Sequence, residues 1–160
     1  MSERKQNDLL NDMRQSPIGF FNLGVSYLDA ADALTRKQFD KADTFQLFFD
    51  SPIRHLYAHA WELFLKACIF RQGMKPSEMK RKIGHSLTKA WDEVDKSRFA
   101  LLDLHPQTRT VPEVLDQFHM PPRMYAYPIT GSRREFTITF VRAASQRFRI
   151  SRRQTLELFG

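Results

Sequence analysis

The stretch PIRHLYAHAWELFLKACIFRQG, residues 52 to 73, most constrains what this chain can fold into. Asp50 and Ser51 ahead of Pro52 mark a helix start, and Gly73 marks its stop. At about 100° per residue, the apolar side chains in between cover most of the circumference of one helix. A helix that is hydrophobic around nearly its whole surface is normally buried, so we expect this segment to be the central helix of the core.

The polar residues of this helix form a single narrow seam. Four polar side chains are spaced four, three and four residues apart, which places them within an arc of roughly 60°. They belong to His55, His59, Glu62 and Lys66. Titratable groups along a buried helix need partners or water. The seam is therefore the solvent-facing side of a core helix, or it lines a packed polar network, a subunit interface or a cleft.

Length and composition favour one domain with a hydrophobic core, because the chain has 160 residues of which 42% are hydrophobic, including 14 Phe. Residues 1–15 are polar and mixed in charge, which predicts a flexible tail ahead of a single domain over residues 16–160. No apolar run reaches the roughly 20 residues of a membrane span. The lone cysteine, Cys68, can form no internal disulfide, so we expect a buried thiol in a cytoplasmic protein without a membrane partner.

Helical spacing recurs on both sides of the central helix. Ser16 followed by Pro17 predicts a helix that runs to about Arg36, and Gly24 inside it predicts close packing against another helix. Further short helices are expected from Pro76, from Ser86 and from about Thr110.

The pattern changes after residue 122. The segments MYAYPIT and EFTITF are rich in aromatic and β-branched residues and are separated by GSRR, which predicts a small hairpin near residues 123–141. Helical character returns over Val141–Phe159. The expected fold is mainly α, an antiparallel helical bundle with at most one small β-hairpin.

An arginine segment holds most of the net positive charge. Between residues 133 and 153 there are seven arginines against one acid, giving +6 of the chain's +7, and they are Arg133, Arg134, Arg142, Arg147, Arg149, Arg152 and Arg153. Guanidinium groups bind phosphate bidentately, and the interleaved Phe136, Phe140 and Phe148 suit base stacking. The segment predicts contact with RNA or another nucleic acid. It is also compatible with a solvated basic face, with buried phenylalanines, or with an acidic partner protein.

Several short motifs occur together in a fixed order. They are His59, Glu62, Leu65-Lys66-Ala67, Gly73 and Gly84-His85-Ser86-Leu87, followed by Arg123-Met124-Tyr125-Ala126-Tyr127-Pro128. In this order and spacing they resemble bacterial members of the HEPN family, the higher eukaryote and prokaryote nucleotide-binding domains. The strong match covers residues 55–91, and a looser match extends from about residue 16 to residue 148.

The resemblance implies a helical bundle that commonly forms homodimers. Many HEPN members are metal-independent endoribonucleases in toxin or antiphage systems, whereas others are non-catalytic dimerisation or adaptor modules that act with a partner enzyme. Active members usually carry Arg-x(4–6)-His near the start of a late helix. Arg54-x4-His59 and Arg98-x6-His105 match that spacing here, but neither pair stands where the motif is expected, which counts against catalysis.

The residues themselves suggest where such chemistry would occur. Metal-independent RNA cleavage needs a base for the ribose 2′-hydroxyl, an acid for the leaving oxygen and a cation for the phosphorane charge. His59 and His85 suit the first two roles, and Lys66 suits the third. Glu62 would orient a histidine. His85 also follows Gly84 at a predicted helix start, where backbone N–H groups favour an anion.

Two other uses of the seam stay open. In a structural network, Glu62 accepts hydrogen bonds from Lys66 and His59 and ties the bundle together. In a metal site, His55 and His59 would bind a metal ion with Glu62 as the third ligand, although the spacing lacks the Glu placement of HExxH proteases. We predict a nucleic-acid-binding homodimer that needs no metal and no cofactor.

Overall fold

The computed structural model describes residues 15–39, 50–95, 98–99, 106–119 and 138–160. Within these ranges the chain forms seven α-helices and no β-strand, which confirms the predicted mainly α helical bundle. The helices are α2 (Pro17–Phe39), α3 (Asp50–Arg71), α4 (Pro76–Lys82), α5 (Leu87–Glu93), α6 (Pro106–His119), α7 (Ile138–Ser145) and α8 (Arg152–Phe159), with a 3-10 turn, η2 (Gln146–Phe148), after α7.

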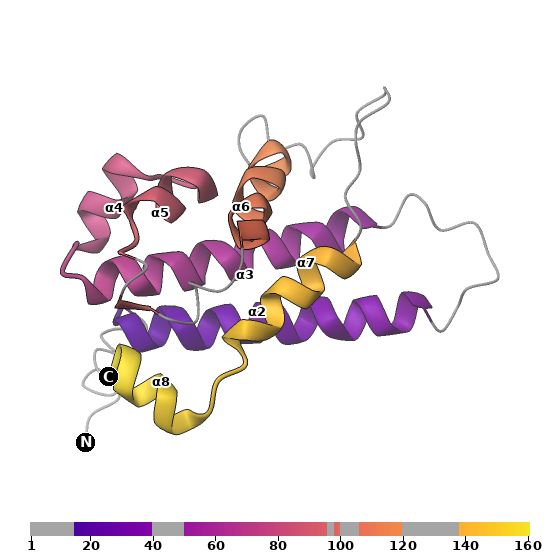
Figure 1. The fold of residues 1–160 in the computed structure, drawn as a ribbon, viewed down its shortest axis with the longest axis horizontal. Helices are drawn as coiled ribbons and strands as arrows, with labels where there is room; N and C mark the ends of the chain where they lie inside the picture. Colours follow the sequence, from indigo (N-terminus) through magenta and orange to yellow (C-terminus); the bar gives the residue numbers. More distant parts are fainter. Residues whose placement is uncertain (1–14, 40–49, 96–97, 100–105, 120–137) are drawn as a thin grey trace, which may run out of the picture.

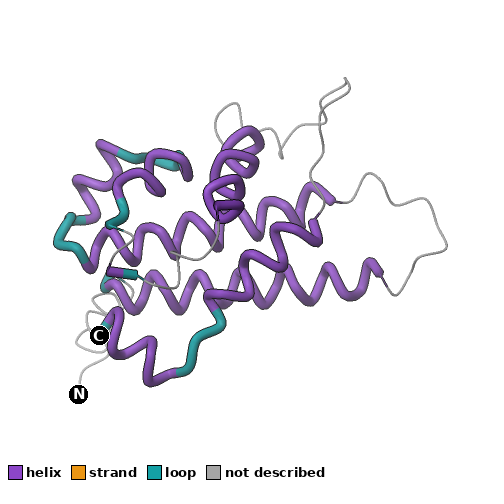
Figure 2. The backbone as a smooth tube through the Cα atoms, in the orientation of Figure 1, coloured by secondary structure: helices purple, strands orange, loops and turns teal. Residues whose placement is uncertain are grey.

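Two long antiparallel helices, α2 and α3, form the frame of the bundle (Figure 1). The short helices α4, α5 and α6 pack on the side of α3 that faces away from α2, while α7 crosses the pair and α8 lies against the end where α2 begins. Short loops connect α3, α4 and α5 (Figure 2). The central helix thus has neighbours on several sides, as its apolar circumference predicts.

The core is built around α3. Tyr57, Trp61, Phe64 and Leu65 of this helix are completely buried. The indole Nε1 of Trp61 donates a hydrogen bond of 2.8 Å to the Ser145 hydroxyl at the end of α7. Cys68 is also fully buried, and burial raises the pKa of its thiol well above the ordinary value.

A column of aromatic rings passes through the core. The ring of Phe148 stacks on Phe64 with centroids 3.9 Å apart, and Phe64 lies 5.2 Å from Phe21. Phe21 in turn stacks on Phe159 at 4.6 Å, and Phe159 lies 5.9 Å from Phe99. The column joins residues of α2, α3, η2 and α8, which are far apart in the sequence.

Gly24 allows α2 and α3 to approach closely. A Cβ atom at this position would lie 2.7 Å from a ring carbon of Phe64 and 3.3 Å from the carbonyl oxygen of Ala60. Only a residue without a side chain fits there, so the predicted role of this glycine in helix packing is confirmed.

One predicted helix boundary differs from the structure. α6 begins at Pro106 rather than near Thr110, because proline is well suited to the first position of a helix, where its missing N–H needs no acceptor. Pro112, two residues after the predicted start, lies inside α6. The helix predicted from Ser86 is α5, which ends at Glu93.

The end of the expected hairpin is helical. Residues 138–141 form the first turn of α7. The buried residues of this helix are Ile138, Val141, Ala144 and Ser145. Their spacing of three and four residues fits a helix, and it overrides the β-branched composition that suggested a strand. The rest of the hairpin segment, with Arg133 and Arg134, lies outside the described residues, as do residues 1–14. Among the helices in the described ranges, none has the length and hydropathy needed to cross a membrane.

Candidate functional site

The buried carboxylate of Glu62 lies at the centre of a polar cluster. Its Oε1 atom accepts hydrogen bonds from Lys66 Nζ at 2.5 Å and from His85 Nδ1 at 2.9 Å. Its Oε2 atom lies 3.5 Å from His59 Nδ1. The structure therefore brings together the four residues that the sequence suggested for catalysis, and we call His59, Glu62, Lys66 and His85 the Glu62 cluster.

Local structure explains how the cluster assembles. His59 and Lys66 stand three residues before and four residues after Glu62, so all three share one face of α3. His85 comes from the turn between α4 and α5, where Gly84 has a φ of +62°. This left-handed backbone conformation favours glycine, and it directs the following residue back onto α3.

Exposure changes along the seam. His55 is exposed and His59 is partly exposed, whereas Glu62 is only 3% exposed. The ring of His59 also contacts Tyr27 of α2 edge-on, with centroids 4.4 Å apart. Burying a carboxylate costs free energy that charge-assisted hydrogen bonds offset. The seam is thus a polar network that leads from the exposed and partly exposed histidines at the surface to the buried carboxylate of Glu62.

A pocket opens beside the cluster. It has a volume of about 260 Å³ and is lined by Phe20, Lys66, Pro76, Met79, Lys80, Gly84 and His85. Its basic side chains suit an anion, and its apolar side chains suit a flat apolar group. Lys66 and His85 connect this pocket to the Glu62 carboxylate, whereas His59 lies on the far side of that carboxylate and does not line the pocket.

The hydrogen bond to Glu62 determines what His85 can do. An ionised carboxylate only accepts hydrogen bonds, so the Nδ1 atom of His85 is the donor. The neutral ring then carries its lone pair on Nε2, which is the arrangement of a general base oriented by a carboxylate. His85 is 53% exposed, so this ring is accessible from solvent.

Asp116 of α6 is the residue that sequence reasoning missed. Its Oδ1 atom accepts the backbone N–H of Leu87 at 2.7 Å, and its Oδ2 atom accepts the N–H of Thr88 at 3.0 Å and the hydroxyl of Ser86 at 2.8 Å. The helix start after His85 does hold an anion, but that anion is the protein's own carboxylate. The expectation that these N–H groups bind a ligand anion is corrected accordingly. No local pattern links two residues thirty positions apart.

Three arginines of the arginine segment make contacts inside the protein. Arg149 pairs with Asp29 and with the buried Asp32 of α2, both at 2.8 Å, and Arg142 lies 3.4 Å from Asp32. Arg147 donates a hydrogen bond to the Thr108 hydroxyl of α6. These interactions hold α2, α6, α7 and η2 together.

Asp32 is stabilised as a carboxylate. Burial by itself raises the pKa of Asp32, but the hydrogen bonds from Tyr57 at 2.6 Å, Gln146 at 3.0 Å and Arg149 at 2.8 Å outweigh burial and hold that pKa below its usual value. Burial and the hydrogen bond to Asp32 together raise the pKa of Tyr57 above its usual value. Arg149 is therefore part of a structural ion-pair cluster.

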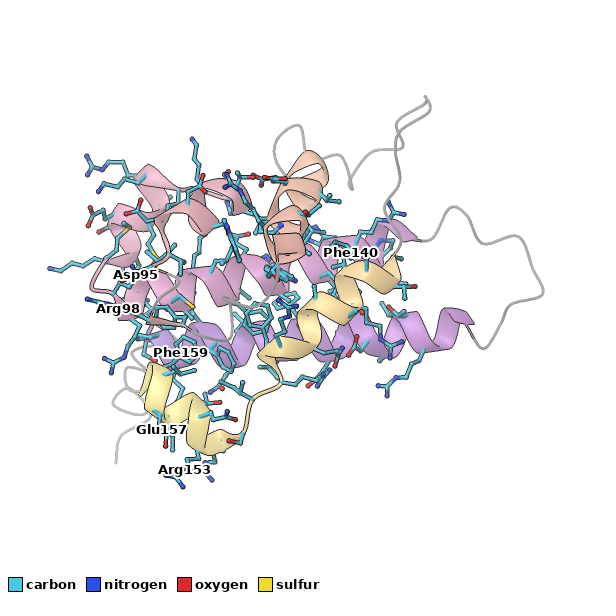
Figure 3. The ribbon with its side chains drawn as sticks, in the orientation of Figure 1. Asp95, Arg98, Phe140, Arg153, Glu157 and Phe159 are labelled. Carbon is cyan, nitrogen blue, oxygen red and sulfur yellow. The ribbon has the colours of Figure 1, made fainter. Side chains whose placement is uncertain are left out.

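The remaining residues of the segment are placed differently. Arg153 pairs with Glu157 at 2.8 Å on the exposed face of α8 (Figure 3), and Arg152 beside it is exposed. Phe148 is a core residue and is not available to stack on a base, and Phe140 is partly buried. Phe136 lies outside the described residues.

The structure bears in part on the other sites that the sequence suggests. Within the part of the chain that the structure describes, no group of three or more His, Cys, Asp or Glu side chains is arranged to hold a metal ion, and this includes His55, His59 and Glu62. Of the two Arg-x-His spacings, the first includes Arg54, which is buried at the start of α3, and the second includes His105, which lies outside the described residues.

Comparison of the chain with protein-family models, with curated proteins and with solved structures found no match. The HEPN resemblance therefore stays a prediction that rests on the motifs themselves.

Proposed function

We propose that this protein binds RNA and cleaves it without a metal ion at the Glu62 cluster. The observation that supports the proposal most directly is that one buried carboxylate holds both Lys66 and His85 at the wall of the same pocket. An ammonium and an oriented imidazole beside a pocket are the groups that phosphoryl transfer without metal requires.

The proposed roles follow from the contacts. His85, oriented by Glu62, takes the proton of the ribose 2′-hydroxyl, whose oxygen attacks the neighbouring phosphorus. Lys66 stabilises the negative charge that develops on the phosphoryl oxygens. Cleavage of the bond between phosphorus and the 5′ oxygen leaves a 2′,3′-cyclic phosphate on one product, and the departing 5′ oxygen takes a proton from solvent water to become the 5′-hydroxyl of the other. His59 lies on the other side of Glu62, so we assign it the role of holding the carboxylate in place.

The proposal includes a homodimer, a cytoplasmic setting and a toxin or antiphage role, which follow the family resemblance. An apolar stripe on α2 supports the dimer. Leu23 and Leu34 are 49% and 41% exposed, and with Tyr27 and Ala30 they follow spacings of four, three and four residues along one face. Exposed apolar stripes of this kind are typical of helix–helix contacts between subunits.

A second function, a non-catalytic adaptor module, has one observation in its favour. Glu62 is buried and bonded to three cationic or polar partners, as a purely structural network would be. In that case the substitution Glu62→Ala lowers stability by several kcal/mol and affects no turnover.

The experiment that tests catalysis is digestion of total RNA by the purified protein in excess EDTA. The wild type should produce fragments with 2′,3′-cyclic phosphate ends, and His59→Ala/His85→Ala should lose at least about 100-fold in rate, the usual contribution of a general base. His55→Ala, which changes an exposed histidine of the same seam, is the matched control and should stay active. Equal cleavage by the wild type and the double variant would exclude the Glu62 cluster. No cleavage by either would favour the adaptor function.

A further inference from the structure

The surface around α4 is the most densely basic exposed part of the described chain near the pocket. Residues 75–82 contain four basic side chains against one acid, Glu78. Lys75, Lys80, Arg81 and Lys82 are all exposed, and Lys89 of α5 is exposed as well. Figure 3 shows nitrogen-tipped side chains projecting outward from α4, away from the frame of α2 and α3.

Within the described ranges, most of these basic side chains form no ion pair, although Glu78 attracts Arg81 as well as Lys82. Lys82 pairs with Glu78 at 2.7 Å. Lys75, Lys80, Arg81 and Lys89 form no side-chain ion pair or hydrogen bond with any residue in the described ranges. Neighbouring cations that lack counter-charges repel one another, so such a surface gains most from binding a polyanion, which releases counterions from the bound chain.

The arginine segment differs in this respect. Three of its described guanidinium groups are already used inside the protein, since Arg142 and Arg149 bind the Asp32 carboxylate and Arg147 binds Thr108. A phosphate that recruited Arg149 would have to leave the buried Asp32 without its main cationic partner, which is costly. The larger formal charge of the segment is therefore a poor guide to where a polyanion binds.

The basic surface is continuous with the candidate site. Lys80 of α4 lines the same pocket as Lys66 and His85. A phosphate chain that lies along α4 would therefore pass directly over the groups that we propose for catalysis. Arg81 follows Lys80 on the exposed side of this short helix, and Lys89 is the third residue of the next helix, α5.

We infer that the RNA backbone is held by the exposed basic face of α4, formed by Lys75, Lys80 and Arg81 with Lys89 of α5, and not by the arginine segment. This inference rests on the proposed function, because it takes RNA as the polyanion. It assigns the sequence-independent phosphate contacts to α4 and leaves the arginines of α7 and η2 a structural role.

The test measures binding of a short fluorescent oligo(U) RNA at several salt concentrations. The variant Lys80→Ala/Arg81→Ala removes two charges from α4, and Arg152→Ala/Arg153→Ala removes two charges from the exposed face of α8 as a matched control. For single strands each lost phosphate contact lowers the slope of log affinity against log salt by about 0.7, so the α4 variant should lose about 1.4 and the control should keep the wild-type slope. Circular dichroism verifies that both variants are folded.

The outcomes separate the inference from the proposed function. Equal losses in both variants, or a loss in the α8 variant alone, would overturn the inference, while wild-type cleavage in EDTA would still support the function. An α4-dependent slope without cleavage would support the binding surface and overturn the catalytic proposal. A wild type that binds neither oligo(U) nor heparin would overturn both.

Discussion

The Oδ1 atom of Asp116 on α6 lies 2.7 Å from the backbone nitrogen of Leu87, two residues after His85. Through this contact a helix that does not line the pocket fixes the turn that supplies the pocket's imidazole. Asp116→Ala should lower the free energy of unfolding by about 1–3 kcal/mol, because two backbone N–H groups and the Ser86 hydroxyl lose their acceptor.

The same substitution should disturb the site and not only the fold. In NMR spectra the His85 ring signals of the Asp116→Asn variant should shift, because the turn no longer holds the ring on Glu62. Asp92→Asn, which removes one charge from the exposed face of α5, is the control and should leave these signals in place. Unchanged His85 signals in Asp116→Asn would show that the turn keeps its geometry without the carboxylate.

Glu62→Gln should destabilise the protein by about 3 kcal/mol, the lower end of the range for breaking a buried ion pair, because Lys66 keeps some access to water. Urea denaturation measures this value. In a double-mutant cycle, Glu62→Gln/Lys66→Met should lose less than the sum of the two single variants, because the pair is removed together. Strictly additive losses would indicate that the hydrogen bond at 2.5 Å contributes little.

Asp32 should make stability depend on acid pH. Its pKa is lower in the folded protein than in the unfolded chain, so its contribution is present above the unfolded value of about 3.8 and is lost as pH falls through the folded value. The stability difference between the wild type and Asp32→Asn should therefore be largest near neutral pH and should shrink below about pH 4. Denaturation at a series of pH values checks this, and a difference that stays constant down to pH 2 would contradict it.

Gly24→Ala should lower the melting temperature even though alanine favours helices by about 1 kcal/mol over glycine. The added methyl group would lie 2.7 Å from the Phe64 ring, which is stacked on Phe148 and cannot move away easily. Overpacking of this kind costs about 1–3 kcal/mol. Ser26→Ala on the exposed face of the same helix is the control and should be neutral or slightly stabilising.

Leu23→Glu/Leu34→Glu should produce a monomer if the apolar stripe of α2 forms the dimer contact. Light scattering coupled to gel filtration gives the mass of the wild type and of this variant. Asn22→Glu/Ala33→Glu, on neighbouring exposed positions of α2, is a control for added charge at the surface outside the stripe. A wild type that is already monomeric would contradict the dimer.

The features best predicted from the sequence are those that depend on helical periodicity within one segment. His59, Glu62 and Lys66 share a face because of helical periodicity alone, and the apolar circumference of α3 predicted its central position. The Gly84-His85 pair was recognised as a helix start, but its contact with Glu62 depends on how α4 turns the chain back onto α3.

Contacts between distant elements were not predictable from local patterns. For the seven arginines the sequence predicts contact with nucleic acid or an acidic partner, because nothing in it shows that Arg149 meets Asp29 and Asp32 across more than a hundred residues. Asp116 was missed for the same reason. The β-branched composition of residues 138–141 predicts a strand, whereas their spacing of apolar residues is also compatible with a helix. The structure forms the helix, in which residues three or four positions apart are buried.

The aromatic column has a consequence for how this protein loses its structure. Phe21 near the start of the described chain stacks directly on Phe159 near its end, and on its other side Phe21 meets Phe64 of α3, which stacks on Phe148 of η2. No helix along this column can detach without exposing a ring of its neighbour to water. Separate unfolding of α2, α3, η2 or α8 should therefore be rare, and the amide groups of these four elements should lose their protection from hydrogen exchange together.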